Sequence, residues 1–142
     1  GSKNPLNKPN AHTDTQPYRI LVVEDNPANQ LMLLKMLAQM NMAADVANHG
    51  KEALDLWMKE PYQVVLTDLQ MPEMDGIELS KALRDREKGI TGSPTYIIGV
   101  TANVLPEHRE KCLAAGMDDF LTKPLKMEAL KRALQKYTPS RV

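Results

Sequence analysis

Residues 20–27 read ILVVEDNP, four apolar residues followed at once by two acids, an asparagine and a proline. The apolar run does not alternate with polar residues, so we expect a strand that is covered on both faces, as in a parallel sheet. Asp25 or Asn26 can cap a helix whose first turn holds Pro27. The apolar positions of that helix would be Leu31, Leu34, Met36, Leu37 and Met40, and Asn41 would end it. This stretch therefore predicts a strand that passes directly into a helix.

The same order of strand and helix recurs four more times along the chain. Further strands are expected at 43–47, 64–68, 96–101 and 120–122, and further helices around 53–58, 79–83, 106–116 and 127–137. Such a chain predicts an α/β fold, the flavodoxin-like doubly wound (βα)5 arrangement, with right-handed crossovers and a five-stranded parallel sheet of order 2-1-3-4-5. We expect this domain to span 17–138. Gly1-Ser2 has the form of a cloning remnant, 3–16 is expected to be a disordered linker, and 139–142 is expected to be a tail.

Composition excludes several classes of protein. The 142 residues carry 18 Lys plus Arg and 18 Asp plus Glu, and this zero net charge argues against a nucleic-acid-binding domain with a strongly basic face. The single cysteine, Cys112, excludes a disulfide framework and fits a reducing compartment. No run of about 18 apolar residues predicts a membrane span, so we expect no membrane contact by this domain.

Five polar residues follow the predicted strands at their carboxyl ends. Each has an ordinary structural explanation when taken singly, as a helix cap, a turn residue or a solvated lysine. Together they would share one edge of the sheet, and ligands of doubly wound folds bind at that edge where the strand order reverses. The five residues are Glu24, Asp25, Asp68, Thr101 and Lys123.

Three carboxylates at one edge repel each other, since two unit charges ~4 Å apart interact by about 4 kcal/mol at an effective dielectric of ~20. Either one acid takes up a proton or a divalent cation binds. Mg²⁺ suits such a site because it takes oxygen ligands, keeps several waters and adds a phosphate oxygen. A metal beside an ionised aspartate, with an ammonium and a hydroxyl nearby, favours phosphoryl transfer, with Asp68 as the nucleophile and Thr101 and Lys123 around the transferred group.

Four ordered motifs carry a resemblance to a known family. They are VVEDN at 22–26, DLQMPEMDG at 68–76, VTA at 100–102 and GMDDFLTKPL at 116–125. The segment from about Tyr18 to Tyr137 resembles the receiver (response-regulator) domain of two-component phosphorelays. The expected strand order, 2-1-3-4-5, rests in part on this resemblance.

The resemblance implies a role for each site residue. Asp68 would be the phospho-acceptor, taking its phosphoryl group from a phosphohistidine. The metal ligands for Mg²⁺ would be Glu24, Asp25, Asp68 and the backbone carbonyl of Gln70, with Glu24 acting directly or through a water. Thr101 and Lys123 would bind the phosphoryl oxygens, Thr101 and Phe120 would form the switch, and Lys123-Pro124 would be a cis peptide.

The motifs most resemble receivers at the C-terminal side of hybrid sensor histidine kinases, although a stand-alone single-domain regulator fits almost as well. The partners would be a histidine kinase core, a histidine phosphotransfer protein or both, and the domain would be a monomer or a weak dimer in the cytoplasm. The domain itself would be a phospho-acceptor with self-catalysed phosphoryl transfer and dephosphorylation. Its parent protein would be a histidine kinase, and that parent would have a membrane anchor if it is an inner-membrane sensor.

Two rival functions remain. One is an aspartate-nucleophile phosphohydrolase, which normally carries its nucleophile after the first strand, and the other is a binding module that keeps only the fold.

Overall fold

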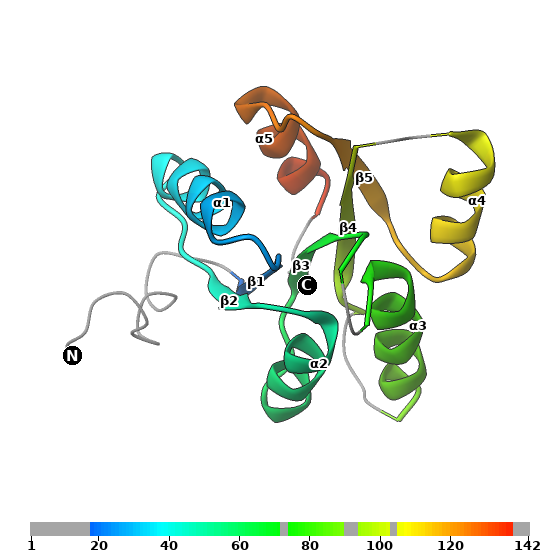
Figure 1. Ribbon diagram of the computed structural model, residues 1–142. Coiled ribbons are helices and arrows are strands. Elements are labelled where there is room, and N and C mark those ends of the chain that lie inside the picture. Colours follow the sequence, from blue (N-terminus) through cyan, green and yellow to red (C-terminus); the bar gives the residue numbers. More distant parts are fainter. Residues whose placement is uncertain (1–17, 72–73, 90–93, 103–104, 138–142) are drawn as a thin grey trace.

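Strands and helices alternate without exception in the computed structural model, which describes residues 18–71, 74–89, 94–102 and 105–137. This part of the chain forms five helices and a five-stranded sheet. Figure 1 shows the helices arranged around the central sheet. In order, the elements are β1 (Ile20–Val23), α1 (Pro27–Gln39), β2 (Asp45–Ala47), α2 (Gly50–Lys59), β3 (Val64–Asp68), α3 (Gly76–Glu87), β4 (Tyr96–Thr101), α4 (Pro106–Ala114), β5 (Asp119–Thr122) and α5 (Met127–Lys136). The expected linker at 1–16 and tail at 139–142 lie outside the described residues.

The sheet is parallel throughout, and its strand order is β2-β1-β3-β4-β5. The predicted fold class and strand order are therefore confirmed. The chain runs outward in one direction from β1 to β2 and in the other from β3 to β5, so the order reverses between β1 and β3. The register places Val23 opposite Thr67, Asp68 opposite Val100 and Thr101 opposite Thr122. The carboxyl ends of these four strands thus meet at one edge of the sheet.

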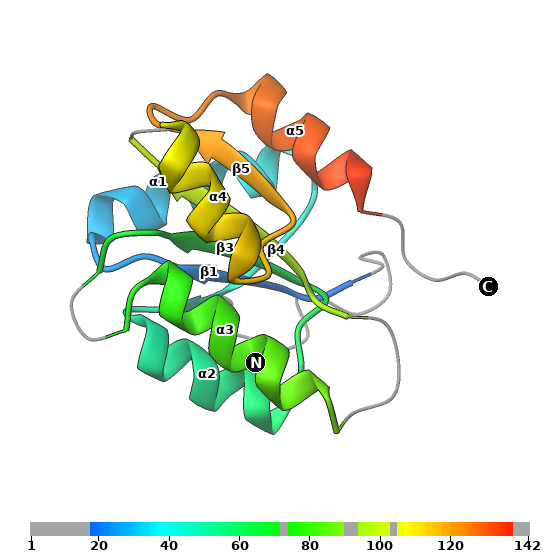
Figure 2. The same cartoon turned by 90° about the vertical axis from the view of Figure 1, so that its right-hand side faces the viewer.

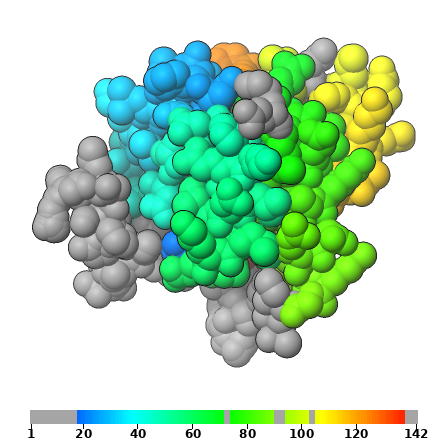
Figure 3. All heavy atoms as spheres, turned by 60° about the horizontal axis from the view of Figure 1, so that its bottom comes forward, coloured from blue at the N-terminus to red at the C-terminus, as the bar shows by residue number. Residues whose placement is uncertain are grey.

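Apolar residues alternate between two cores, one on each face of the sheet. Ile20 and Val22 point into the core beneath α1 and α5, whereas Leu21 and Val23 point into the core beneath α2, α3 and α4. Because successive strand side chains point to opposite faces, a fully apolar strand supplies both cores at once. Figures 1 and 2 show α1 and α5 away from the pair α2 and α3, and Figure 3 shows α2 and α3 side by side on the surface.

The inward face of α1 differs from the expected one. Leu33 and Leu37 are buried, whereas the side chain of Leu31 is 53% exposed. The prediction that Leu31 belongs to the inward face is wrong, and Leu33 was missed. The run Leu31-Met32-Leu33-Leu34 places apolar side chains on every side of the helix, so spacing alone does not select the buried face. The helix ends as expected, with Asn41 in the left-handed region at φ 61°.

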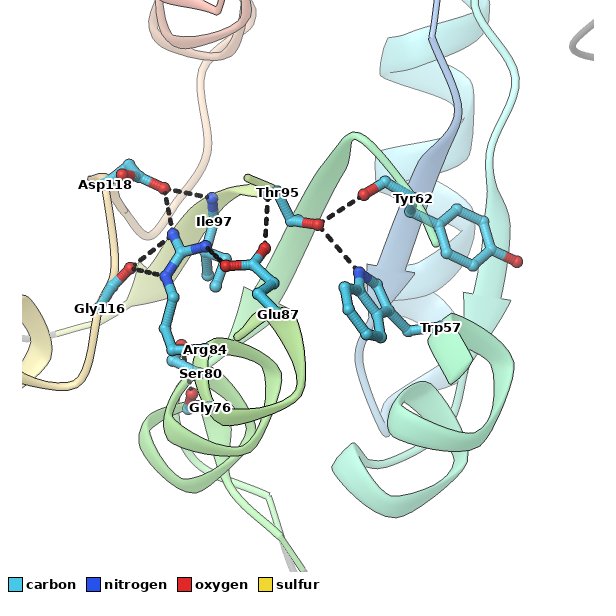
Figure 4. Close-up of polar contacts among 10 residues, drawn as sticks. All are labelled: Trp57, Tyr62, Gly76, Ser80, Arg84, Glu87, Thr95, Ile97, Gly116 and Asp118. Atoms are coloured by element: carbon cyan, nitrogen blue, oxygen red, sulfur yellow. Dashed lines mark hydrogen bonds and ion pairs between the residues drawn. The ribbon is translucent and has the colours of Figure 1, made fainter. Parts of the chain in front are cut away.

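One arginine joins α3 to the loop between α4 and β5 (Figure 4). The Nε and Nη2 atoms of Arg84 both donate to the carbonyl of Gly116, at 3.0 and 2.8 Å. The same guanidinium forms ion pairs with Glu87 at 2.7 Å and with Asp118 at 2.8 Å. Gly116 has φ 104°, a conformation that residues with a Cβ rarely adopt, and a Cβ there would lie 2.5 Å from Arg84 Cγ. This glycine therefore lets the guanidinium reach the loop.

A second set of polar contacts lies just before β3 and β4, also visible in Figure 4. The indole N–H of Trp57 donates to Thr95 Oγ1 at 2.9 Å, and that hydroxyl donates to the carbonyl of Tyr62 at 2.7 Å. The backbone N–H of Thr95 donates to Glu87 Oε2 at 2.7 Å. These contacts and those of Arg84 fasten the amino-terminal edge of the sheet, which is opposite to the edge that carries the acids.

None of the helices in the described ranges has the length and apolar character needed to cross a membrane.

Candidate functional site

Three acids come together at the carboxyl edge of the sheet. Glu24 and Asp25 directly follow β1, and Asp68 is the last residue of the neighbouring strand β3. One carboxylate oxygen from each of the three lies within 4.8 Å of the others. The acids that the sequence placed at one strand edge therefore do form a cluster, between β1 and β3, where the strand order reverses.

The cap of α1 leaves Asp25 with its carboxylate at the surface. Asn26 Oδ1 accepts from the backbone N–H groups of Ala28 at 2.8 Å and Asn29 at 3.1 Å, so Asn26 is the capping residue. Capping by Asp25, which the sequence left open, does not occur. The Asp25 side chain is exposed and has no hydrogen bond or ion pair within the described ranges. Its carboxylate is thus available for a ligand at the acid cluster.

Glu24 is the buried member of the cluster, with only 2% of its surface exposed. Its Oε2 atom accepts from the backbone N–H of Asn26 at 3.1 Å and from Asn29 Nδ2 at 3.4 Å. Burial raises the pKa of the Glu24 carboxyl and the charge of Asp68 raises it further, while the Asn26 N–H and the Lys123 ammonium oppose these effects. A cation placed beside Glu24 would therefore favour its ionised form.

Asp68 lies between a backbone donor and a cation. Its Oδ1 accepts from the N–H of Gln70 at 3.2 Å, and its Oδ2 lies 3.3 Å from the ammonium nitrogen of Lys123. Asp68 is buried, whereas the Lys123 side chain is 32% exposed. A Cβ on Gly76 would lie 2.6 Å from the Asp68 carbonyl oxygen, so glycine is required where α3 begins close to this strand end.

The loop after β5 is attached to the end of β4. The N–H of Lys123 donates to the carbonyl of Thr101 at 2.9 Å, and the Lys123–Pro124 peptide bond is cis. Thr101 is buried at the last position of β4, one residue beyond the partner of Asp68 in the sheet. The attachment places Thr101 and Lys123 beside the strand that carries Asp68.

Phe120 lies outside the acid cluster, on β5. Its ring is half-buried against the core beneath α2, α3 and α4, and the guanidinium carbon of Arg109 lies 5.7 Å from the ring centroid. Gln70 contacts Asp68 through its backbone N–H, and the use of its carbonyl as a metal ligand remains a prediction.

Sequence reasoning assigned no role to Asn29 and Gln30, although both lie in the stretch EDNPANQ at 24–30. Asn29 contacts the carboxylate of Glu24, and Gln30 Nε2 donates to the Glu24 carbonyl at 2.6 Å. The signal that could have found them is their spacing, since positions five and six residues after Glu24 lie in the first turns of α1, close to the strand end.

A groove of about 390 Å³ borders the cluster on one side. It lies between the start of α1 and the loop after β5, and the exposed side chain of Met32 lies on its rim. The lining residues are Glu24, Asn29, Met32, Leu33, Val100, Lys123, Pro124 and Leu125. An apolar groove thus adjoins the charged site.

The donor set of the cluster fits a small hard cation. Mg²⁺ binds oxygen at about 2.0 to 2.1 Å, so two oxygens on opposite sides of one ion are about 4.2 Å apart. The three carboxylates, within 4.8 Å of one another, are close to that spacing. A binding site that holds few carboxylates and leaves positions for water and phosphate oxygens is typical of Mg²⁺.

Comparison with known proteins identifies the same segment. The family described as the response regulator receiver domain matches residues 20–135. Among curated proteins, the sensor histidine kinase RcsC of Escherichia coli is 39% identical over 127 residues, which cover 89% of this chain and 13% of RcsC. The chain therefore spans only a small part of the length of this relative.

Two solved structures are similar in both sequence and fold. The receiver domain of sensor histidine kinase PA1611 from Pseudomonas aeruginosa, solved with a magnesium ion in its active site cleft, matches with a TM-score of 0.75 and 37% identity, covering 84% of this chain and 96% of that one. The receiver domain of Ssk1 from Saccharomyces cerevisiae, crystallised with the histidine phosphotransfer protein Ypd1, matches with a TM-score of 0.79 and 32% identity, covering 84% and 87%.

Proposed function

The chain belongs to the response regulator receiver domain family, and from that premise we propose that Asp68 accepts a phosphoryl group from a phosphohistidine of a partner protein. The observation that supports this assignment is the meeting of three carboxylates within 4.8 Å, with the Lys123 ammonium 3.3 Å from Asp68. Such a cluster places a nucleophile and a cation where a phosphoryl group can reach both.

The proposed transfer uses groups that this chain holds in place. A carboxylate oxygen of Asp68 attacks the phosphorus, the bond from phosphorus to the histidine nitrogen breaks, and the leaving imidazole takes up a proton. Glu24, Asp25, Asp68 and the carbonyl of Gln70 would hold Mg²⁺, which supplies positive charge to the phosphoryl oxygens. The Lys123 ammonium, now paired with Asp68, would pair with a phosphoryl oxygen instead, and Thr101 would donate its hydroxyl to another.

The product would act as a conformational signal through Thr101 and Phe120. Moving a two-state protein from 1:99 to 99:1 takes about 5.5 kcal/mol of preference for one state. Phosphorylation adds roughly −1.5 to −2 charges, and hydrogen bonds to charged groups contribute about 1.5 to 3 kcal/mol each. Two such bonds, from Thr101 and Lys123, supply most of the required preference. Phe120 sits on β5 between the core and Arg109, a position from which a movement of Thr101 would reach the surface of α4.

The parent protein is proposed to be a hybrid sensor histidine kinase, because RcsC, which this chain resembles over 13% of its length, is a sensor histidine kinase. The phosphoryl group would pass between a kinase core and a histidine phosphotransfer protein, as the complex of the Ssk1 receiver with Ypd1 supports. The exposed apolar residues Leu31 and Met32 on α1, beside the groove at Glu24 and Lys123, fit a protein partner that brings its histidine to the acids. The domain would act on the cytoplasmic side of a membrane.

A phosphorylation assay tests the assignment. The protein is incubated with a small-molecule phosphodonor with and without Mg²⁺, and the mass increase of one phosphoryl group is followed. We expect Mg²⁺-dependent labelling that Asp68→Asn abolishes and that Asp55→Asn, which changes an exposed aspartate of α2, leaves intact. Undiminished labelling of the Asp68→Asn variant would refute the assignment. Continuous release of phosphate from a phosphomonoester, rather than labelling by the phosphodonor, would indicate a phosphohydrolase instead.

A further inference from the structure

We propose that Gln30 is a positioning residue of the metal site, because it holds the main chain of Glu24 and ties it to the loop between β2 and α2. The inference rests on the proposed function, in which Glu24 helps to bind a divalent cation. Gln30 is the last residue of the stretch EDNPANQ at 24–30, and the proposed phosphoryl transfer gives it no part.

The side-chain amide of Gln30 makes two short hydrogen bonds. Its Nε2 atom donates to the Glu24 carbonyl at 2.6 Å and to Asn48 Oδ1 at 2.8 Å. An amide nitrogen carries two N–H groups, so each of these bonds has its own hydrogen. Gln30 sits near the start of α1, where its backbone N–H already bonds to the carbonyl of Asn26 at 2.9 Å. Both N–H groups of the Gln30 side chain are therefore used, one on the loop between β1 and α1 and the other on the loop between β2 and α2.

Glu24 needs such support because it lies just beyond the last residue of β1. Its N–H still bonds to the sheet, at 3.1 Å from the Ala47 carbonyl, whereas its own carbonyl has left the ladder and bonds to Gln30. The carboxylate is held separately by Asn26 and Asn29. With main chain and carboxylate both held, Glu24 is oriented before a cation arrives, and partners that orient a metal ligand in this way strengthen metal binding.

The second bond of Gln30 continues into α2. Asn48 donates through its backbone N–H and its Nδ2 to Glu52 Oε1, at 2.8 and 3.0 Å. Glu52 lies in the first turn of α2, where its N–H donates to the capping His49 Nδ1 at 3.2 Å. A continuous chain of hydrogen bonds thus runs from Glu24 through Gln30 and Asn48 to the start of α2. Binding of a cation at Glu24 should therefore alter the hydrogen bonds of Asn48.

The test compares Gln30→Met with Gln39→Met. Methionine keeps the length of glutamine but has no N–H donor, and Gln39 is an exposed residue of the last turn of the same helix. Mg²⁺ is titrated into each folded protein without phosphodonor, and its affinity is measured by isothermal titration calorimetry. The side-chain amide signals of Asn48 are followed separately by NMR. We expect Gln30→Met to bind Mg²⁺ about ten-fold more weakly, the lower end of the loss seen when an outer partner of a metal ligand is removed.

Two readouts separate positioning from a purely structural role. In the parent and in Gln39→Met the Asn48 amide signals should shift on Mg²⁺ addition, and in Gln30→Met they should not. A Gln30→Met variant that is less stable to heat without metal but binds Mg²⁺ as tightly as the parent would overturn the inference. If the parent itself fails to bind Mg²⁺, the proposed function is overturned and this inference with it. The titration of the parent alone distinguishes that outcome from a failure of the inference about Gln30.

Discussion

Asp25→Asn should stabilise the metal-free protein and greatly reduce its stabilisation by Mg²⁺. Asp25 is an exposed carboxylate with no hydrogen bond or ion pair to the residues that the structure describes, so the substitution removes no favourable contact there. It does remove two repulsions, those of Asp25 with Glu24 and with Asp68, across at most 4.8 Å between the nearest oxygens of the cluster. The substitution therefore isolates the electrostatic cost of keeping three acids together.

The size of the effect follows from those distances. At 4.8 Å two unit charges repel by about 3.5 kcal/mol at an effective dielectric of about 20, and by about 0.9 kcal/mol in bulk water. Because Asp25 is exposed and its charge is screened by solvent, the lower figure applies, and the two pairs together give about 2 kcal/mol. For a domain of about 120 residues this raises Tm by about 7 °C.

Magnesium should reverse the order of stability. A ligand at a concentration 100 times its Kd stabilises the folded state by about 2.7 kcal/mol, so saturating Mg²⁺ raises the Tm of the parent. The variant, lacking one of three carboxylates, should gain much less. Differential scanning calorimetry in EDTA and in Mg²⁺ measures both effects, with Asp55→Asn on α2 as the control that should change stability by no more than about 0.5 kcal/mol.

A decrease in Tm of Asp25→Asn in EDTA would refute the reasoning, since it would mean that Asp25 makes favourable contacts that outweigh the repulsion. Equal Mg²⁺ stabilisation of variant and parent would refute the assignment of Asp25 as a metal ligand.

Three further predictions concern the same fold. Burial raises the pKa of Glu24, so ionisation of this carboxyl destabilises the folded state as pH rises above the ordinary pKa of 4.5. Glu24→Gln should therefore be more stable than the parent at pH 7 without metal. Urea titrations should show this advantage disappearing as pH falls toward 4.5. Arg84→Met should lower the free energy of unfolding by about 2 to 3 kcal/mol, because it leaves the Gly116 carbonyl and the Asp118 carboxylate without the guanidinium, and an unchanged urea midpoint would count against this. Trp57→Phe should lower the free energy of unfolding by about 2 kcal/mol, because it removes a buried hydrogen bond to the Thr95 hydroxyl. An equal urea midpoint for variant and parent would contradict this.

The cluster of acids could be predicted from the sequence because it depends only on strand ends. Glu24, Asp25 and Asp68 each follow an apolar run that reads as a buried strand, and parallel strands bring their carboxyl ends to one edge whatever the details of packing. The approach of Lys123 to Asp68 could be expected for the same reason, since Lys123 directly follows the last residue of β5, Thr122.

The partners of these side chains could not be predicted, because they depend on where neighbouring elements lie. Asp25 and Asn26 are both good capping residues, and only the path of the chain into α1 selects Asn26. Leu31 and Leu33 are equally apolar, and only the position of α1 against the sheet buries Leu33 and exposes Leu31. The bond of Gln30 to Asn48 spans 18 residues, and nothing in the order of residues between them requires it.

The sequence by itself determined the repeated strand and helix units, the parallel sheet and the edge at which the acids lie, because these follow from the local periodicity of apolar residues and from the rule that crossovers are right-handed. Tertiary structure alone decided which side chains join elements that are far apart in the chain, from the bond of Gln30 to Asn48 to the bonds of Arg84 to Gly116 and Asp118. Hydrogen bonds are short and directional. Residues far apart in the chain therefore form them only after packing has brought the donor and the acceptor to about 3 Å from each other in a suitable orientation.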